Sequence, residues 1–248
     1  MQANTNQAYH QMRRDLATML HGSGGILMTG RTAKSNHPLL ADRRNTGFKL
    51  HLQMTNPDAP LCPFCFDIRT VNHSTGRGPF TPEMVKLAAQ CMRCVQFQHG
   101  LACDAIVGVP RAGEPFAKMH ARVANKHCLE LAKSERGDQR KIVPPLKPFP
   151  EGVRTVVVVD GLVTGGNSKL QAAEALAGKG VEVTDVVVLI DLEQGGREKL
   201  AKRGINLHSV FTSTELFDLL MGLGRIPDRI YNKIGDYLTL QQGFLAKA

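Results

Sequence analysis

The chain has 248 residues, of which 42% are hydrophobic and 21% are charged. This composition excludes a largely disordered chain and is typical of one α/β core with an appended smaller subdomain. No stretch approaches the ~18 apolar residues of a membrane span, and no apolar segment of signal-peptide length follows Arg13 and Arg14. We therefore expect a cytoplasmic protein without membrane association.

The chain is basic, with 31 Lys and Arg against 22 Asp and Glu and a formal net charge of +9. Such a charge attracts polyanions, among which are phosphorylated small molecules and nucleic acids. The sequence contains no recognisable DNA-reading motif, and three Tyr and no Trp provide few platforms for base stacking. We therefore do not expect nucleic acid as a partner.

The N-terminal part begins with a predicted amphipathic helix over residues 1–27, in which Leu16 and Leu20 share the apolar face and a glycine cluster ends the pattern. Residues 28–47 form a basic connection, for which a surface loop is favoured over a binding arm. A strand is predicted near Phe48.

Two CxxC pairs, at residues 62–65 and 91–94, suggest a four-thiolate zinc site when taken alone. However, Cys65 falls in a strand-like apolar run, and the second pair lies on a helical pattern over residues 82–97. Small cysteines are common in such buried positions. The sequence favours buried thiols over zinc, and it gives no reason to expect disulfides.

The segment from residue 101 to residue 213 alternates strand and helix patterns and predicts the core sheet. Residues 104–115 (DAIVGVPRAGEP) indicate a strand followed by a loop. Residues 128–143 (CLELAKSERGDQRKIV) are polar and bounded by strands, so they are either a lid with cations for an anionic ligand or a solvated charged loop.

Residues 156–169 (VVVVDGLVTGGNSK) are the most informative segment of the chain. A β-branched run predicts a buried parallel strand, and Asp160 stands at its carboxyl end. Hydroxyl residues and glycines then precede a helical pattern over residues 170–178. Open backbone at a helix N-terminus predicts a phosphate site.

A second buried strand is predicted at residues 186–190, followed by a loop at 191–196 and a short basic helix. The tail has a leucine pattern typical of a packed helix, and a second short helix is predicted after Pro227.

These motifs resemble those of one enzyme family. Residues 156–169 resemble the phosphoribosyl-pyrophosphate (PRPP) motif of type I phosphoribosyltransferases. The Asp-x-Glu-Gln-Gly-Gly turn at 191–196 and the Leu-His-Ser-Val strand after it are similar to those of orotate phosphoribosyltransferases, and residues 66–69 resemble that family's Asp-x-Arg element. Residues 104–115 are similar to its pyrophosphate-binding loop. Together the matches span about residues 60–225.

The resemblance implies an α/β fold in which helices flank a parallel sheet and a small hood subdomain is appended. We expect an N-terminal helix and hood region over residues 1–100, a PRPP-binding core over 101–213 and C-terminal helices over 214–248. The implied reaction is the Mg²⁺-dependent transfer between PRPP and orotate. Mg²⁺ would come with PRPP rather than from protein ligands, and a homodimer would donate its lid across the interface.

The resemblance also implies the site residues. The 5′-phosphate would be held by Thr164, Gly165, Gly166, Asn167 and Ser168. The pyrophosphate would be held by Val109, Pro110, Arg111, Ala112 and Gly113. Asp160 would contact the ribose, and Lys133 and Arg136 of the lid would act on the leaving charge.

The chain departs from the family pattern at three places. Gly161 stands where the family has a second acidic residue, and His51 where a lysine lies near the base. The lid has Ala132 and Asp138 at the family's arginine and aromatic positions. These departures leave two alternatives: a non-catalytic PRPP- or nucleotide-binding regulator, and a transferase for another base.

Overall fold

The computed structural model describes residues 2–29, 41, 46–72, 77–134, 141–144 and 148–246. By contacts between residues, the chain forms two compact units, one of residues 1–9 with 83–210 and the other of residues 10–82 with 211–248. The expected division at residues 100 and 213 follows chain order and stays a prediction. None of the helices in the described ranges is long and apolar enough to cross a membrane.

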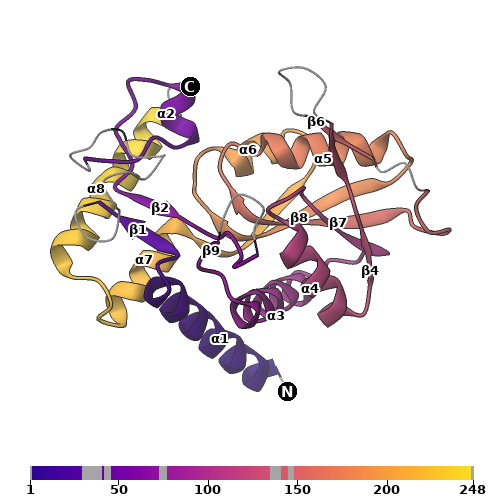
Figure 1. Cartoon of the computed structure of the whole chain (residues 1–248), viewed down its shortest axis with the longest axis horizontal. Helices are drawn as coiled ribbons and strands as arrows, with labels where there is room; N and C mark the ends of the chain where they lie inside the picture. Colours follow the sequence, from indigo (N-terminus) through magenta and orange to yellow (C-terminus); the bar gives the residue numbers. More distant parts are fainter. Residues whose placement is uncertain are drawn as a thin grey trace. The chain divides into compact units, whose positions relative to one another are not determined.

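The first unit is built on a five-stranded sheet with the order β4-β3-β7-β8-β9 (Figure 1). The strands in this order are β4 (His127–Leu129), β3 (Ala105–Gly108), β7 (Thr155–Val163), β8 (Glu182–Asp191) and β9 (Asn206–Thr212). The pairs β3–β4, β3–β7 and β7–β8 are parallel. The expected fold class is therefore confirmed.

Helices cover both faces of this sheet, as Figure 1 shows. One face carries α5 (Asn167–Ala177) and α6 (Gly196–Ala201), and the other carries α3 (Pro82–Gln98) and α4 (Glu114–Ala124). Because both faces are covered, the two central strands are apolar along most of their length, and residues 156–160 and 186–190 are all buried.

Two predicted elements in this unit agree closely with the structure. The helix expected over residues 82–97 is α3, which begins at Pro82, a favoured first position. The helix after the glycine motif starts three residues earlier than expected, at Asn167, because Gly166 takes a left-handed conformation and begins the helix directly.

The second unit contains β1 (Ile26–Met28) paired antiparallel with β2 (Phe64–Phe66). It also contains α2 (His51–Thr55), α7 (Ser213–Gly222) and α8 (Asp228–Leu245), while α1 (Gln2–Gly22) begins in the first unit and continues into the second. Its aromatic core comprises Phe64, Phe66, Phe217 and Tyr237, with ring centroids 4.7–5.9 Å apart.

Two sequence predictions for this unit were wrong in detail. The strand expected near Phe48 is a single bridge to Cys62, and the chain then turns into α2. The Leu50 amide donates to Gln53 Oε1 over 2.9 Å, which caps the helix locally. The final helix, expected to be short, has 18 residues because Ile230, Ile234 and Tyr237 form one continuous buried face.

Two short strands, β5 (Ala132–Ser134) and β6 (Lys141–Val143), pair antiparallel. They frame the expected lid, whose central residues 135–140 lie outside the described ranges.

Candidate active site

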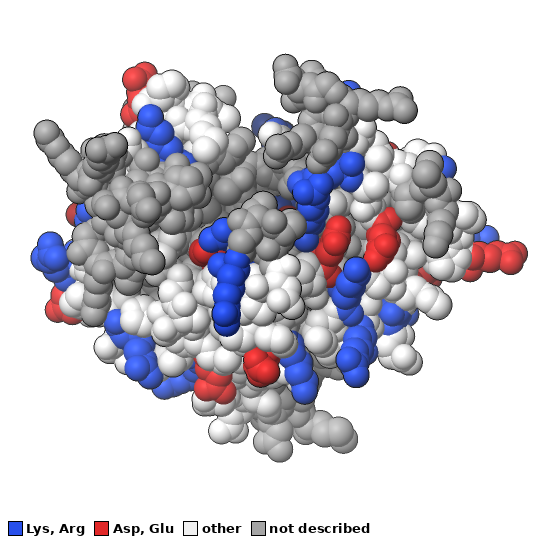
Figure 2. All heavy atoms as spheres, in the orientation of Figure 1, with Lys and Arg blue, Asp and Glu red and all other residues white. Residues whose placement is uncertain are grey.

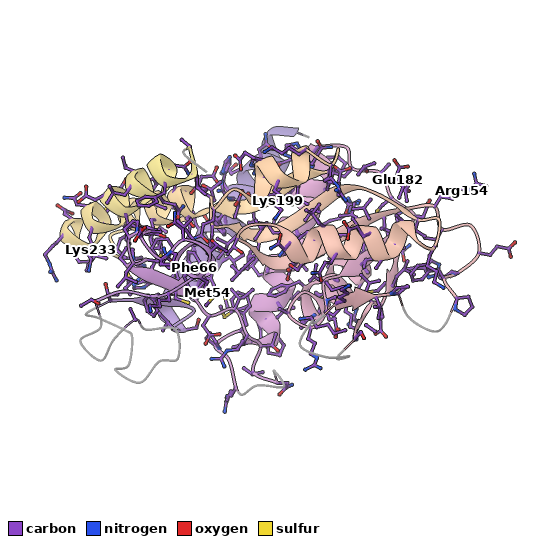
Figure 3. All side chains as sticks on the ribbon, turned by 90° about the horizontal axis from the view of Figure 1, so that it is seen from above. Met54, Phe66, Arg154, Glu182, Lys199 and Lys233 are labelled. Carbon is purple, nitrogen blue, oxygen red and sulfur yellow. The ribbon has the colours of Figure 1, made fainter. Side chains whose placement is uncertain are left out.

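Three loops meet at one edge of the core sheet because they follow the carboxyl ends of parallel strands. They are residues 109–113 after β3, residues 164–166 after β7 and residues 192–195 after β8. Arg154 and Glu182 lie at the amino ends of β7 and β8, and Figure 3 shows Lys199, on α6, well away from both. Lys199 is therefore on the side of the sheet edge where the carboxyl ends of these strands lie. The sequence-predicted phosphate and pyrophosphate loops are therefore neighbours in the fold.

The loop at residues 109–113 folds back on the end of β7. The Val109 amide donates to the Val159 carbonyl oxygen over 3.1 Å, and the Gly113 amide donates to the Val109 carbonyl oxygen over 2.9 Å. A Cβ on Gly113 would lie 2.6 Å from the Val159 carbonyl oxygen, so the loop needs glycine there. Arg111 and Ala112 are exposed at its tip, and the Pro110–Arg111 peptide is cis.

The loop at residues 164–166 leads directly into α5. Gly166 has φ +79°, and its carbonyl oxygen accepts the amides of Lys169 and Leu170 at 3.1 Å each. Gly165 and Gly166 are buried, whereas Asn167 is exposed and Thr164 and Ser168 are half-buried. Since the first amides of a helix have no partner within it, this geometry can hold an anionic oxygen group.

The turn at residues 191–196 supports the phosphate loop from the neighbouring strand. A Cβ on Gly196 would lie 2.3 Å from the Thr164 carbonyl oxygen, and the Leu192 amide donates to the Val163 carbonyl oxygen over 2.9 Å. From α6, Lys199 Nζ donates to Asn167 Oδ1. The paired glycines of this turn are visible in the sequence, but their role in bracing the phosphate loop depends on the contact between the two loops.

Asp191 begins this turn and is almost fully buried, at 2% exposure. Burial raises the pKa of its carboxyl above the usual range, although the Glu193 amide at 2.9 Å and Arg197 at 3.3 Å act in the opposite direction. These contacts hold the turn in shape.

Asp160 lies at the end of β7 and is 5% exposed. Its Oδ1 accepts the Gly161 amide over 2.7 Å, and its Oδ2 accepts Lys169 Nζ over 2.5 Å. Lys169 was not among the residues predicted for the site. The available signal was its place in the first turn of a helix, one residue after the phosphate motif.

Other predicted site residues are located less completely. Lys133 lies on β5, exposed, with Ile142 opposite it on β6. Arg136 lies outside the described residues. His51 begins α2 in the second unit rather than a strand, and its side chain is not described.

The two CxxC pairs fall in different units, with Cys62 and Cys65 around β2 and Cys91 and Cys94 on α3. Burial raises the pKa of the Cys62 and Cys65 thiols to about 12, so both are protonated at neutral pH. Within the described ranges, no group of three or more His, Cys, Asp or Glu side chains is arranged to hold a metal ion.

The parallel sheet, with a glycine-rich phosphate loop and a second loop beside it at the carboxyl edge, defines the class that the motifs predicted, the type I phosphoribosyltransferases. Residues 81–219 match the family model described as the phosphoribosyl transferase domain. The chain is also 31% identical over 183 residues to the orotate phosphoribosyltransferase of Sulfolobus acidocaldarius, with 74% of this chain and 87% of that protein covered. The chain belongs to the phosphoribosyltransferase family.

Two further similarities agree with this assignment. The chain is 35% identical over 122 residues to bovine uridine 5′-monophosphate synthase, and the match spans 47% of this chain but only 24% of that protein. The solved orotate phosphoribosyltransferase of Aeropyrum pernix has the same fold, with a TM-score of 0.58 at 24% identity, and 86% of this chain and 99% of that one are covered.

Proposed function

We propose that this protein is an orotate phosphoribosyltransferase, which joins orotate to the ribose 5-phosphate of PRPP and releases pyrophosphate. The product, orotidine 5′-phosphate, belongs to pyrimidine nucleotide biosynthesis. The observation that carries the proposal is the glycine-lined loop at residues 164–168, braced by Gly196 and adjoining the fixed carboxylate of Asp160. The relatives named orotate phosphoribosyltransferase support the choice of base.

The reaction breaks the bond between C1 of the ribose and the pyrophosphate oxygen, and a ring nitrogen of orotate forms the new bond to C1. The sugar carries positive charge in the transition state, so the site must fix the substrate and stabilise the departing anion. Residues 164–168 would hold the 5′-phosphate, Asp160 would accept a ribose hydroxyl, and residues 109–113 would hold the pyrophosphate. Lys133 and Arg136 would place cations over the leaving group.

Mg²⁺ is part of the proposal as a companion of PRPP. Both oxygens of Asp160 already accept hydrogen bonds from the protein, so this carboxylate suits a sugar hydroxyl better than a metal ion. The oxygens of PRPP itself would hold Mg²⁺, which when bound neutralises charge on the pyrophosphate.

The proposal extends to a cytoplasmic homodimer in which the β5–β6 hairpin serves the neighbouring subunit. Lys133 is exposed on this hairpin, where an ammonium group is free to approach a second chain. On the face drawn in Figure 2, Lys and Arg side chains are interspersed with Asp and Glu. This distribution favours small phosphorylated substrates over nucleic acid as the partners.

A second candidate function is a PRPP-binding regulator without turnover. Gly161 in place of an acidic residue and Ala132 in place of an arginine favour it, because each removes a charged group from the expected machinery. Asp138 favours it because it puts a negative charge where the family has an aromatic side chain. A transferase acting on a different base is the remaining alternative within the enzyme class.

One assay separates these functions. The protein is incubated with PRPP and Mg²⁺ and with orotate, uracil, adenine or hypoxanthine in turn, and pyrophosphate release is measured. We expect release only with orotate, accompanied by loss of orotate absorbance. Release with another base would reassign the substrate, and PRPP binding without base-dependent release would favour the regulator.

A further inference from the structure

Lys169 is a buried lysine in the first turn of α5, with only 4% of its surface exposed. Lysine is almost never buried to this degree unless its charge is paired. Nothing in the proposed mechanism uses this side chain, although it lies beside the proposed sugar site.

The three N–H groups of the Lys169 ammonium have three acceptors. They are Asp160 Oδ2 at 2.5 Å, the Leu162 carbonyl oxygen, and Ser168 Oγ at 3.4 Å. Two of these acceptors lie on β7 and the third at the start of α5. Lys169 therefore ties together the two sides of the phosphate loop and has no donor left for a substrate.

These contacts also fix the Asp160 carboxylate. Gly161 donates to one oxygen and Lys169 to the other, so the plane of the carboxylate is held from both sides. Each carboxylate oxygen has two lone pairs, which leaves room for a further donor such as a sugar hydroxyl.

Two other charged groups near the site are bonded elsewhere. Asp191 at the end of β8 accepts from Arg197, and Lys199 on α6 donates to Asn167. Across the sheet, Val188 on β8 stands opposite Asp160. Among the described residues, Lys169 is the one cation that donates to Asp160, and a buried carboxylate left without its cation is costly.

We propose that Lys169 is a positioning residue of the sugar site. Its ammonium group balances the buried charge of Asp160 and orients the carboxylate, so that this single carboxylate accepts a ribose hydroxyl in a chain where Gly161 supplies no second one. This inference rests on the proposed function, because it assumes that ribose 5-phosphate occupies the site.

The test measures the affinity of ribose 5-phosphate and of inorganic phosphate by calorimetry in one buffer at a single pH. Both ligands place a phosphate in the loop, but only ribose 5-phosphate carries a sugar that reaches Asp160, so the ratio of the two affinities reports the carboxylate. In the wild type we expect a ratio that favours ribose 5-phosphate.

Lys169→Met should lower the ratio by about tenfold to a hundredfold, because a charged hydrogen-bonding arrangement is lost. Asp160→Asn should lower the ratio to a similar degree, and the double variant Asp160→Asn/Lys169→Met should lower it little further, because Lys169 acts through Asp160. A purely structural role for Lys169 would weaken both ligands equally and leave the ratio unchanged.

Each outcome is decisive. A wild type that shows no preference for ribose 5-phosphate overturns the proposed sugar site. A wild-type preference that persists unchanged in Lys169→Met overturns the role of Lys169 alone. If Lys169→Met does not fold, Lys169→Gln, which retains a neutral donor, is measured in the same way and should show the same loss.

Discussion

Gly196 lies so close to Thr164 that a Cβ at Gly196 would be 2.3 Å from the Thr164 carbonyl oxygen and 2.8 Å from Val163 Cγ2. The turn after β8 therefore presses directly on the loop after β7. This contact explains why the Asp-x-Glu-Gln-Gly-Gly turn ends in glycine. Because Gly196 has no side chain, the turn after β8 can pack against the loop after β7 and brace it.

Gly196→Ala should displace the phosphate loop, because its Cβ would overlap the Thr164 carbonyl oxygen and the hydrogen bond from Leu192 to Val163 holds the two loops together. Overpacking of this kind destabilises a protein by about 1–3 kcal/mol, and we expect ribose 5-phosphate affinity to fall as well. Thermal unfolding and calorimetry measure the two effects. The control is Gly222→Ala, where a Cβ meets nothing within 4 Å and both properties should stay near wild type. Wild-type affinity in Gly196→Ala would show that the brace is dispensable.

Gly166→Asp tests the phosphate cradle. Gly166 has φ +79°, so any side chain there is strained, and its Cβ would lie 3.3 Å from the Gly196 carbonyl oxygen. Gly166→Asn carries the same strain without the charge and is the matched control. If a phosphate binds here, Asp should weaken orotidine 5′-phosphate binding at least about tenfold more than Asn, because two anions then face each other. Equal affinities in the two variants would place the phosphate elsewhere.

Gly161→Asp should restore a second carboxylate beside Asp160. A charged hydrogen bond contributes about 1.5–3 kcal/mol, so turnover with orotate should rise by about tenfold to a hundredfold. Orotate absorbance follows the reaction. The complete absence of base-dependent PRPP consumption in both proteins, with tight PRPP binding, would favour the regulator over the enzyme.

Lys133→Ala should lower turnover more than it lowers PRPP affinity, because the ammonium group strengthens its contact as charge develops on the pyrophosphate. Lys141→Ala is the control: Lys141 is exposed on the same hairpin but pairs with Ser134, so its side chain points to the other face. Equal losses in the two variants would reduce Lys133 to a general electrostatic role. Initial rates over a range of PRPP concentrations separate the two effects.

His120 should make the protein sensitive to acid. It is fully buried on α4, its Nε2 lies 2.8 Å from Gln96 Oε1, and burial lowers its pKa from 6.5 to about 4. Between pH 6.5 and pH 4, His120 is therefore protonated in the unfolded chain but neutral in the folded chain. The free energy of unfolding keeps its full value above this window and decreases as pH falls through it.

At 1.36 kcal/mol per pKa unit, this histidine alone should remove about 3 kcal/mol of stability at the acidic end of the window. His120→Gln keeps a donor for Gln96 but cannot be protonated, so urea unfolding should show a smaller loss between pH 7 and pH 4. His127→Gln, at an exposed histidine, should behave as the wild type does. An acid loss in His120→Gln as large as in the wild type would contradict this account.

The sequence by itself predicted the parallel core, because its signals are local. The β-branched run at residues 156–159 can only be satisfied by burial on both faces, and β7 confirms it. Glycines before a helical pattern likewise predicted the loop that leads into α5, since a left-handed residue and a helix start are short-range features. Local preferences failed near Phe48, where the Gln53 cap turned an expected strand into α2.

Tertiary structure alone decided how the site is assembled. The contact between Gly196 and Thr164 exists because β7 and β8 pair in parallel up to Val163 and Asp191, which brings together loops that are distant in the chain. Lys169 reads as an ordinary helix-surface lysine in the sequence, and only the turn from β7 into α5 buries its ammonium group against Asp160. Residue types and their spacing identify which groups a site contains, whereas strand register and helix orientation determine which of those groups meet and which charges are neutralised.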